Sequence, residues 1–355
     1  MTYRVVQWAT GSVGAISLRQ IIEHPDLELV GVLVHDPAKA GVDAGRLCGL
    51  PGTGITATTS IDEILAIDAD CISHNPRNTN ETTDELVRVL EAGRNVVSCA
   101  LLPGLFPGAS HVSGRTTELL EAACHAGGVS CFISGIDPGF ASDALPLFLA
   151  SISGRIDRIR MLGIRNYNEY DDAFTQLEWF GFGQPMDSEA PPFLAPHRLI
   201  RVWGPVVEMV ATGLGVELDE LRAVSERFPT AQAVSGIVGA IEAGTVGAYR
   251  FEVQGIVDGE PFVVRENVAR YHPAVAPDLP QPSRPGGCYR VLIDGWPNYE
   301  LDLTASDEEG DEYLGMEAAT GLRAVNAIPD VCEARPGVLS PLDLGEVRPR
   351  PGLVR

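Results

Sequence analysis

The first part of the chain alternates short apolar runs with segments whose apolar residues recur every three or four positions. Val5 and Val6 form the first run, residues 16–22 follow at helical spacing, and Leu27 to Val34 is a second run. Short apolar runs indicate buried strands, and recurrence at three and four residues indicates an amphipathic helix. The pattern therefore predicts a strand, a helix and a second strand in succession.

The same alternation continues to about residue 140. Ser60, with Glu63 three residues later, is typical of a helix N-cap. Strands that alternate with helices at this spacing form a parallel sheet, so residues 1–140 are predicted to be a Rossmann-type α/β domain. The further expected strands are 70–75, 95–100 and 129–134, and the expected helices are 82–92 and 116–125.

Beyond residue 140 the expected strands become longer and follow one another directly, and Asp258-Gly259 is a hairpin signal between two of them. This order predicts an α+β domain at 141–314 with an open mixed sheet, then a last helix and an extended tail at 315–355. Pro205 and Pro329 should kink or end their helices. The expected helices are 144–152, 173–180, 199–214 and 315–331, and the expected strands are 155–164, 246–257, 260–271, 289–293 and 299–304.

A glycine-rich turn separates the first strand from the first helix. Ala9-Thr10-Gly11-Ser12-Val13-Gly14 fits the dinucleotide fingerprint G-x-G-x-x-G, with Ala9 in the first glycine place. Gly11 allows the backbone to approach a pyrophosphate, and Gly14 allows the helix and the strand to pack closely. The helix N–H groups would face the anion. The alternative is a glycine-bearing turn with no ligand.

Cofactor choice is left open by the residues after the second strand. Asp36 lies 22 residues beyond Gly14, where a carboxylate accepts hydrogen bonds from an adenosine ribose, which favours NAD. Lys39 and Arg46 are close enough in sequence to meet a 2′-phosphate, which favours NADP. We therefore expect NAD(P)H, with a slight preference for NAD.

The charge balance limits the possible partners. The 26 basic and 48 acidic residues give a net charge of −22, and the isoelectric point is near 4.6. Such a surface repels phosphate backbones, so we expect no nucleic-acid partner. No apolar run approaches about 18 residues, and the chain leads from Met1 straight into a strand. We expect no signal peptide, no membrane span and a cytoplasmic location.

Several other classes of site are not favoured. The seven cysteines are scattered without a C-x-x-C pair, so we expect reduced thiols. The seven histidines form no HExxH or clustered ligand set, so we expect no metal site. A Gly-x-Ser-x-Gly elbow is absent, which argues against a serine hydrolase. Lys39 is the only lysine, which excludes a Schiff-base lysine elsewhere.

Five motifs in order resemble those of the dihydrodipicolinate-reductase-like oxidoreductases, in the branch of 2,4-diaminopentanoate dehydrogenase and the native amine dehydrogenases. The resemblance spans residues 3 to about 345. The motifs are Val5-Val-Gln-Trp-Ala-Thr-Gly-Ser-Val-Gly14, Asp36-Pro-x-Lys39, Gly135-Ile-Asp-Pro-Gly-Phe140, Gly181-Phe-Gly183 and Ala319-Thr-Gly-Leu-Arg-Ala-Val-Asn-Ala-Ile-Pro329.

The resemblance implies a Rossmann domain and an α+β domain whose sheet builds a homodimer, with a last helix that packs on the first domain. It implies hydride transfer between NAD(P)H and a C=N or C=O carbon. One departure concerns a glutamate that follows the strand matching Asn95 to Ser98 in amine dehydrogenases and holds ammonia or the iminium. Here the stretch reads Ser98-Cys-Ala-Leu-Leu102, without a carboxylate.

The candidate site residues fall into three groups. The expected cofactor-binding residues are Ala9, Thr10, Gly11, Ser12, Val13, Gly14, His35, Asp36, Lys39, Asn75, Pro76, Ser98 and Cys99. The candidates for proton handling are Asp137, Asp143, His74 and Tyr167, and those for a substrate pocket are Ala100, Leu101, Phe140, Tyr170 and Trp179. Each candidate for chemistry has a structural alternative, such as a helix-start carboxylate for Asp143 or packing for the aromatic residues.

Three functions are compatible with these features. The first is an NAD(P)H-dependent oxidoreductase that reduces a small, fairly apolar carbonyl or imine compound, as amine dehydrogenases do. The second is a carbonyl reductase that does not use ammonia. The third is a dinucleotide-binding sensor or scaffold without turnover, since a fold does not fix a function.

Overall fold

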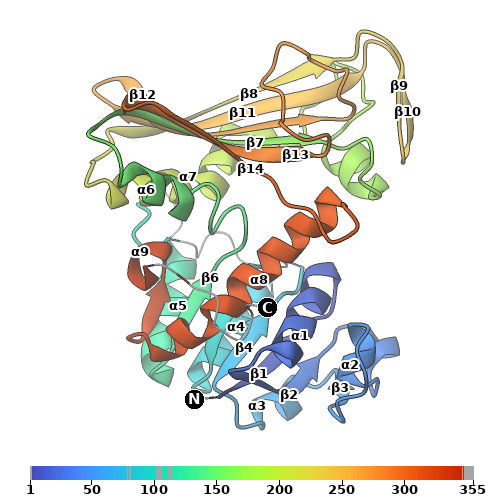
Figure 1. The fold of residues 1–355 in the computed structure, drawn as a ribbon, viewed down its shortest axis with the longest axis vertical. Coiled ribbons are helices and arrows are strands. Elements are labelled where there is room, and N and C mark those ends of the chain that lie inside the picture. The colour runs from blue at the N-terminus through green and yellow to red at the C-terminus, as the bar shows by residue number, and fades with distance from the viewer. Residues whose placement is uncertain are drawn as a thin grey trace. The chain divides into compact units, whose positions relative to one another are not determined.

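A computed structural model of the chain describes residues 2–77, 79, 81–100, 106–110, 114–345 and 347. Its internal contacts divide the chain into two compact units (Figure 1). The first unit comprises Met1–Pro107, Ser113–Phe140 and Glu317–Arg355, and the second comprises Gly108–Val112 and Ala141–Met316.

The first unit is built on a seven-stranded sheet in which every neighbouring pair is parallel. The carboxyl ends of all its strands therefore meet at one edge. This confirms the predicted Rossmann-type sheet. In spatial order the strands are β15 (Gly337–Leu339), β6 (Ser130–Ile133), β5 (Asn95–Ser98), β4 (Cys71–His74), β1 (Tyr3–Trp8), β2 (Leu27–Leu33) and β3 (Ala57–Thr58).

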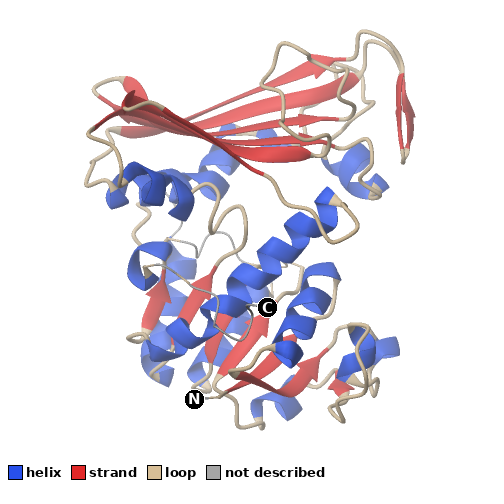
Figure 2. Ribbon diagram, viewed as in Figure 1, coloured by secondary structure: helices blue, strands red, loops and turns tan. Residues whose placement is uncertain are grey.

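Helices cover both faces of this sheet (Figure 2). Leu86 and Leu120 of two helices pack with Trp8 in one core cluster. On the other face, Ile328 packs with Val5 in a second cluster. The helical elements are α1 (Ser12–Glu23), η1 (Pro37–Lys39), α2 (Ala44–Leu47), α3 (Ile61–Leu65), α4 (Thr82–Glu91), α5 (Gly114–Gly127), α8 (Glu312–Glu333) and α9 (Pro341–Leu344).

The last part of the chain departs from the expected pattern. Pro329 lies inside α8 and does not end it, because the helix continues to Glu333. The tail after Arg335 was expected to be merely extended, but β15 pairs in parallel with β6, and Ser340 begins α9 with a capping box. Three residues flanked by glycine and proline are too short for an apolar pattern to reveal a strand.

The second unit is built on a six-stranded open mixed sheet, as predicted. Only β12 and β7 pair in parallel, and the other neighbours are antiparallel. Asp258 and Gly259 both have positive φ, +52° and +82°, as a two-residue hairpin of this kind requires. In spatial order the strands are β14 (Tyr299–Leu303), β13 (Gly287–Trp296), β7 (Arg155–Asn166), β12 (Glu260–Arg270), β11 (Val246–Val257) and β8 (Glu220–Pro229).

One long helix, α7 (Pro196–Gly213), lies against β8, β11 and β12 and runs through Pro205 as one element. The expected helix at 173–180 is a short π-helical segment, η3 (Phe174–Trp179). The sequence pattern missed β8 because six of its ten residues are exposed and four of the ten are charged, so that no buried alternation is visible. The remaining elements are α6 (Ala144–Ala150), η4 (Pro192–Leu194), and the hairpin of β9 (Val234–Gly236) and β10 (Gly239–Ile241).

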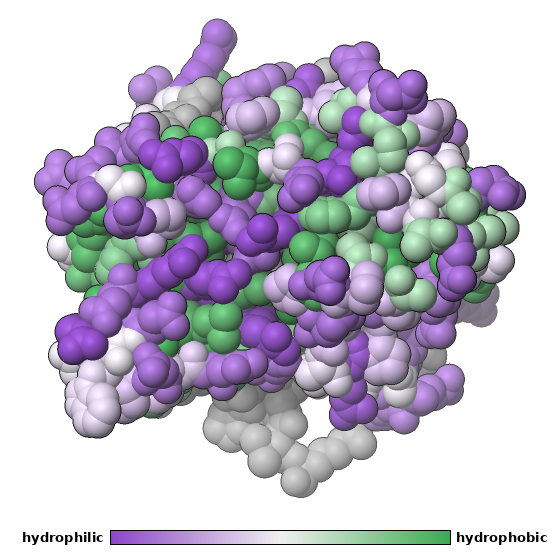
Figure 3. All heavy atoms as spheres, turned by 90° about the horizontal axis from the view of Figure 1, so that it is seen from above, coloured by the Kyte–Doolittle hydropathy of each residue, from purple (hydrophilic) through white to green (hydrophobic). Residues whose placement is uncertain are grey.

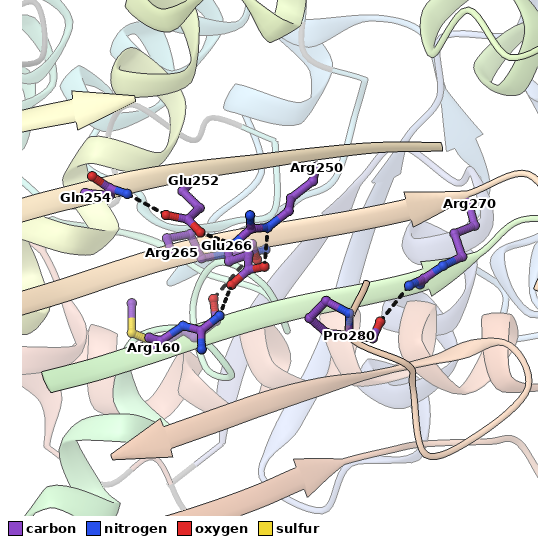
Figure 4. A network of polar contacts seen from close by, with 9 residues as sticks. Arg160, Arg250, Glu252, Gln254, Arg265, Glu266, Arg270 and Pro280 are labelled. Atoms are coloured by element: carbon purple, nitrogen blue, oxygen red, sulfur yellow. Dashed lines mark hydrogen bonds and ion pairs between the residues drawn. The ribbon is translucent and has the colours of Figure 1, made fainter. Parts of the chain in front are cut away.

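The two faces of the mixed sheet differ in chemistry. Arg265 lies over the ring of Trp203 in α7, at 4.3 Å, so the next residue, Glu266, points to the opposite face. Glu266 is fully buried and pairs with Arg160 at 2.5 Å and Arg250 at 2.7 Å (Figure 4). Viewed from above Figure 1, hydrophilic and hydrophobic side chains are interleaved (Figure 3).

Candidate dinucleotide site

A cavity of about 590 Å³ lies in the first unit, where β1, β2 and β4 end. In open α/β sheets this carboxyl edge is where ligands bind. The lining residues come from the turns after these strands and from the start of α4. They are Ala9, Thr10, Gly11, Val34, His35, Asp36, Lys39, Asn75, Pro76, Arg77, Thr79, Glu81 and Glu85.

The two glycines of the glycine-rich turn are needed for different reasons. Ala9 has φ +72°, and its carbonyl oxygen accepts a 2.8 Å hydrogen bond from the buried Gln7 amide. A Cβ on Gly14 would lie 2.3 Å from that same oxygen, so no side chain fits there. A Cβ on Gly11 would meet nothing within 4 Å. Gly14 is therefore needed by the fold, whereas the space at Gly11 faces the cavity.

The start of α1 is suited to an anion. Gly11 is the N-cap residue, it provides no side-chain cap, and the first turn holds no acidic residue. The first N–H groups of a helix lack intrahelical partners and carry a partial positive charge. Ser12 and Val13 belong to this first turn. A phosphate group would satisfy these donors.

Asp36 and Lys39 line the cavity beside this turn. Asp36 Oδ1 accepts a 2.9 Å hydrogen bond from the Ala38 N–H and begins η1, whereas Oδ2 makes no hydrogen bond with the described residues. Lys39 Nζ donates to the carbonyl of Thr10 at 2.8 Å. Arg46 is not among the lining residues, but Arg77 is. Sequence reasoning missed Arg77, although its place directly after Asn75-Pro76 could have indicated it.

Asn75 provides a buried acceptor at the cavity wall. Its amide nitrogen donates to Ser17 Oγ at 2.9 Å, and its Oδ1 has no hydrogen-bond partner in the described part of the chain. Buried polar atoms in proteins nearly always have a hydrogen-bond partner, so this atom is a candidate to accept one from a ligand. A hydroxyl group of a bound ligand would be a suitable donor. The cavity, the free helix N–H groups and this acceptor together fit a dinucleotide.

His74, Ser98 and Cys99 lie near the cavity but do not line it. His74 is fully buried, and its Nδ1 lies 2.9 Å from Ser98 Oγ. Cys99 contacts the Thr320 carbonyl at 3.7 Å, and burial raises the pKa of its thiol to about 12. It shares a separate space of about 60 Å³ with Asp137. The raised pKa favours the protonated form of the Cys99 thiol.

The other candidates have varied surroundings. Asp143 is buried and accepts a 2.6 Å hydrogen bond from the Ala144 N–H at the start of α6. This is the helix-start role that was expected as the structural alternative to a catalytic one. Ala100 is buried after β5, and Leu101 lies outside the described residues. The Arg323 guanidinium lies 5.4 Å from the centre of the Phe140 ring.

The aromatic candidates other than Phe140 belong to the second unit. Tyr167 packs edge-on against Tyr170 and Phe180, and burial raises the pKa of its hydroxyl above the usual range. Trp179 is 49% exposed and stacks on Phe193. These residues form one aromatic cluster, which extends to Phe182 and Tyr249.

None of the described helices is long and apolar enough to cross a membrane. Nor do His, Cys, Asp or Glu side chains in the described ranges gather in threes around a possible metal position.

Comparisons with known proteins agree with this geometry. The family of the 2,4-diaminopentanoate dehydrogenase C-terminal domain matches residues 203–351. An amine dehydrogenase of Streptomyces virginiae is 40% identical over 347 residues, which cover 96% of this chain and 95% of that protein.

Solved structures share the fold at lower identity. The amine dehydrogenase from Mycobacterium smegmatis superposes with a TM-score of 0.76, at 20% identity, over 99% of this chain and 98% of that one. GenD2 from gentamicin A biosynthesis, solved in complex with NAD, gives a TM-score of 0.54 at 16% identity, over 97% and 90% of the two chains.

The parallel sheet, the glycine-rich turn and the cavity beside it, together with these relatives, define an NAD(P)-dependent oxidoreductase. Within that class, the chain belongs to the dihydrodipicolinate-reductase-like family, in the branch of the amine dehydrogenases and 2,4-diaminopentanoate dehydrogenase.

Proposed function

We propose that the protein transfers hydride between NAD(P)H and the carbon of a C=O or C=N group in a small, fairly apolar molecule. The observation that carries this proposal is the 40% identity to an amine dehydrogenase over nearly the whole chain. The dinucleotide supplies the hydride when bound, and the protein must hold it, orient the acceptor and manage one proton.

The cofactor is proposed to occupy the cavity beside the glycine-rich turn. The N–H groups after Gly11 would hold the pyrophosphate, and Asp36 Oδ2 would accept from a ribose hydroxyl. Asn75 Oδ1 would accept from a second hydroxyl group. Gly11, Asp36 and Asn75 all line this cavity, which supports the proposal.

Proton handling is proposed for Asp137 or Tyr167, as two separate hypotheses. Burial keeps Tyr167 protonated, because its pKa is raised, so it can donate a hydrogen bond to a carbonyl or imine. Asp143 and His74 are weaker candidates, because one holds a helix start and the other is enclosed away from the cavity.

Whether ammonia is a substrate depends on the segment after β5. Ser98, Cys99 and Ala100 include no carboxylate, whereas amine formation needs a group that orients an ammonium ion. This departure favours a carbonyl reductase without ammonia as the second candidate. A dinucleotide-binding protein without turnover is the third.

The deciding experiment is an absorbance assay at the NAD(P)H band. Purified protein is given ketones and aldehydes of increasing apolar size, each with and without ammonia. Oxidation of NAD(P)H that requires ammonia supports an amine dehydrogenase, and oxidation without it supports a carbonyl reductase. Tight cofactor binding without turnover on any compound contradicts the enzymatic proposals and favours a sensor.

A cytoplasmic location and a homodimer are also proposed. All seven cysteines are free thiols, which supports a reducing compartment. The sheet face that bears Glu266 also carries Val224, which is 46% exposed and in register with Glu252. An interleaved charged and apolar face of this kind is suited to a second copy of the chain.

A further inference from the structure

Three strands of the parallel sheet end in residues that share one face. Trp8 pairs in register with His74, and His74 pairs in register with Ser98. Residues directly paired in parallel strands point to the same side of the sheet. Trp8 packs with Leu86 of α4 on that side. One turn of α4, at Glu85, therefore stands over His74.

The polar groups on the two sides of the His74 ring favour one tautomer. Ser98 Oγ accepts a 3.1 Å hydrogen bond from the Ala100 N–H and lies 2.9 Å from His74 Nδ1. Glu85 Oε2 faces Nε2 at 3.7 Å, and a carboxylate can only accept, so the neutral ring is favoured with its proton on Nε2 and the Ser98 hydroxyl then donates to Nδ1.

His74 is held in its neutral form. It has no exposed surface, and this burial lowers the pKa of the imidazole. The Glu85 carboxylate opposes this shift, and His35 adds to it. Nε2 makes no hydrogen bond in the described part of the chain, so its N–H is available to the carboxylate.

Glu85 links this buried chain to the cavity. Its side chain is 16% exposed and lines the cavity proposed for the dinucleotide. A carboxylate there repels a pyrophosphate but accepts hydrogen bonds from neutral O–H or N–H donors. Its rotamer would be variable unless a fixed donor held it.

We propose that His74 is a positioning residue whose Nε2–H orients the Glu85 carboxylate to accept a hydrogen bond from a hydroxyl or amino group of the bound dinucleotide. The Ser98 hydroxyl, as a donor to Nδ1, is compatible with the tautomer that this role needs. The inference rests on the dinucleotide site proposed above, and it assigns a role to two residues that chemistry at the reacting carbon does not require.

Two matched substitutions of His74 test the roles of Nε2 and Nδ1 separately. His74→Gln places an amide N–H near the Nε2 position, whereas His74→Asn places one near Nδ1 and loses contact with Glu85. We expect the NADH dissociation constant to stay within about threefold of wild type in His74→Gln, and to rise roughly tenfold in His74→Asn and in Glu85→Gln. Glu91→Gln, an exposed change on the same helix, is the control.

The double variant His74→Asn/Glu85→Gln gives the decisive comparison. If His74 acts through Glu85, the double variant binds NADH about as weakly as either single variant. Fully additive losses, or wild-type affinity in His74→Asn, would overturn the proposal and leave the dinucleotide site intact. Wild-type protein that binds neither NADH nor NADPH would contradict the site itself, and this inference with it.

A measurement on the unmodified protein guards against variants that fail to fold. Nitrogen-15 spectra of histidine-labelled wild-type protein report which ring nitrogen carries the proton. We expect His74 to be protonated on Nε2 alone at neutral pH, with its signal shifting when NADH is added. A proton on Nδ1, or a signal that does not respond to NADH, would contradict the proposed role.

Discussion

Lys39 Nζ donates a 2.8 Å hydrogen bond to the carbonyl oxygen of Thr10, and so joins the segment after β2 to the turn after β1. Both residues line the cavity, and the only lysine of the chain uses part of its donor capacity on Thr10. Asp36, three residues earlier, keeps one carboxylate oxygen without a hydrogen bond to any described residue. This arrangement favours a ribose hydroxyl over a 2′-phosphate.

Replacing Asp36 should therefore change cofactor choice. In Asp36→Ser the hydroxyl can still cap η1, but the acceptor and its negative charge are lost. We expect NADH to bind about tenfold more weakly and NADPH about tenfold more tightly. Titration of both nucleotides by calorimetry checks this. Equal losses for both would show that Asp36 does not discriminate between them.

Two glycines of the same turn should respond differently. Gly11→Asp should leave the fold intact, because a Cβ there meets nothing within 4 Å, yet it should abolish dinucleotide binding through the added charge. Gly14→Ala should lower the free energy of unfolding by about 1–3 kcal/mol, since its Cβ would press on the Ala9 carbonyl. Thermal unfolding and nucleotide titration of both variants test the contrast. Unchanged affinity in Gly11→Asp would overturn the assignment of the pyrophosphate site.

The imidazole of His74 should make stability depend on pH. Its pKa in the folded protein lies below the ordinary value of 6.5, mainly because of burial. The unfolded chain then binds more protons between these two values, so stability is full above pH 6.5 and is lost as pH falls toward the folded pKa. Chemical denaturation of wild type and His74→Gln between pH 5 and 8 should show a weaker slope in the variant. Parallel curves would contradict the assignment.

The buried carboxylate of Glu266 should matter more than an exposed one of the same sheet. Glu266→Ala leaves Arg160 and Arg250 without their shared partner and should cost about 3–5 kcal/mol of unfolding free energy. Glu300→Ala, whose side chain is 65% exposed, should cost less than about 1 kcal/mol. Urea unfolding measures the free energy of both variants. Similar losses in the two would show that the buried ion pairs of Glu266 do not contribute more than an exposed pair.

The proposed homodimer can be tested on the same sheet face. Val224→Arg should shift the protein from dimer to monomer in size-exclusion chromatography with light scattering, because it adds a buried charge at the proposed contact. Leu119→Arg, at a 41% exposed position in the first unit, is the matched control and should leave the mass unchanged. A wild-type protein that runs as a monomer would exclude the proposed assembly.

Much of this structure was predictable because local patterns agree with global packing. Alternating strands and helices predicted the parallel sheet, and Asp258-Gly259 predicted the hairpin between β11 and β12 of the mixed sheet. By contrast, β8 was missed because its exposed charged residues carry no buried stripe. The contribution of Glu85 to the cavity depends on how close in space α4 lies to the end of β4, which spacing along the chain does not encode.

The first unit is assembled from both ends of the polypeptide. Val5 of β1 shares a core cluster with Val325 and Ile328 of α8, and β15 completes the sheet edge beside β6. During synthesis, the apolar residues on one face of the sheet therefore stay uncovered until α8 is made, which happens only after the whole second unit. Such long-range closure slows folding and exposes the chain to aggregation. The dinucleotide cavity belongs to this late-completed unit, so binding competence should be among the last properties the new chain acquires.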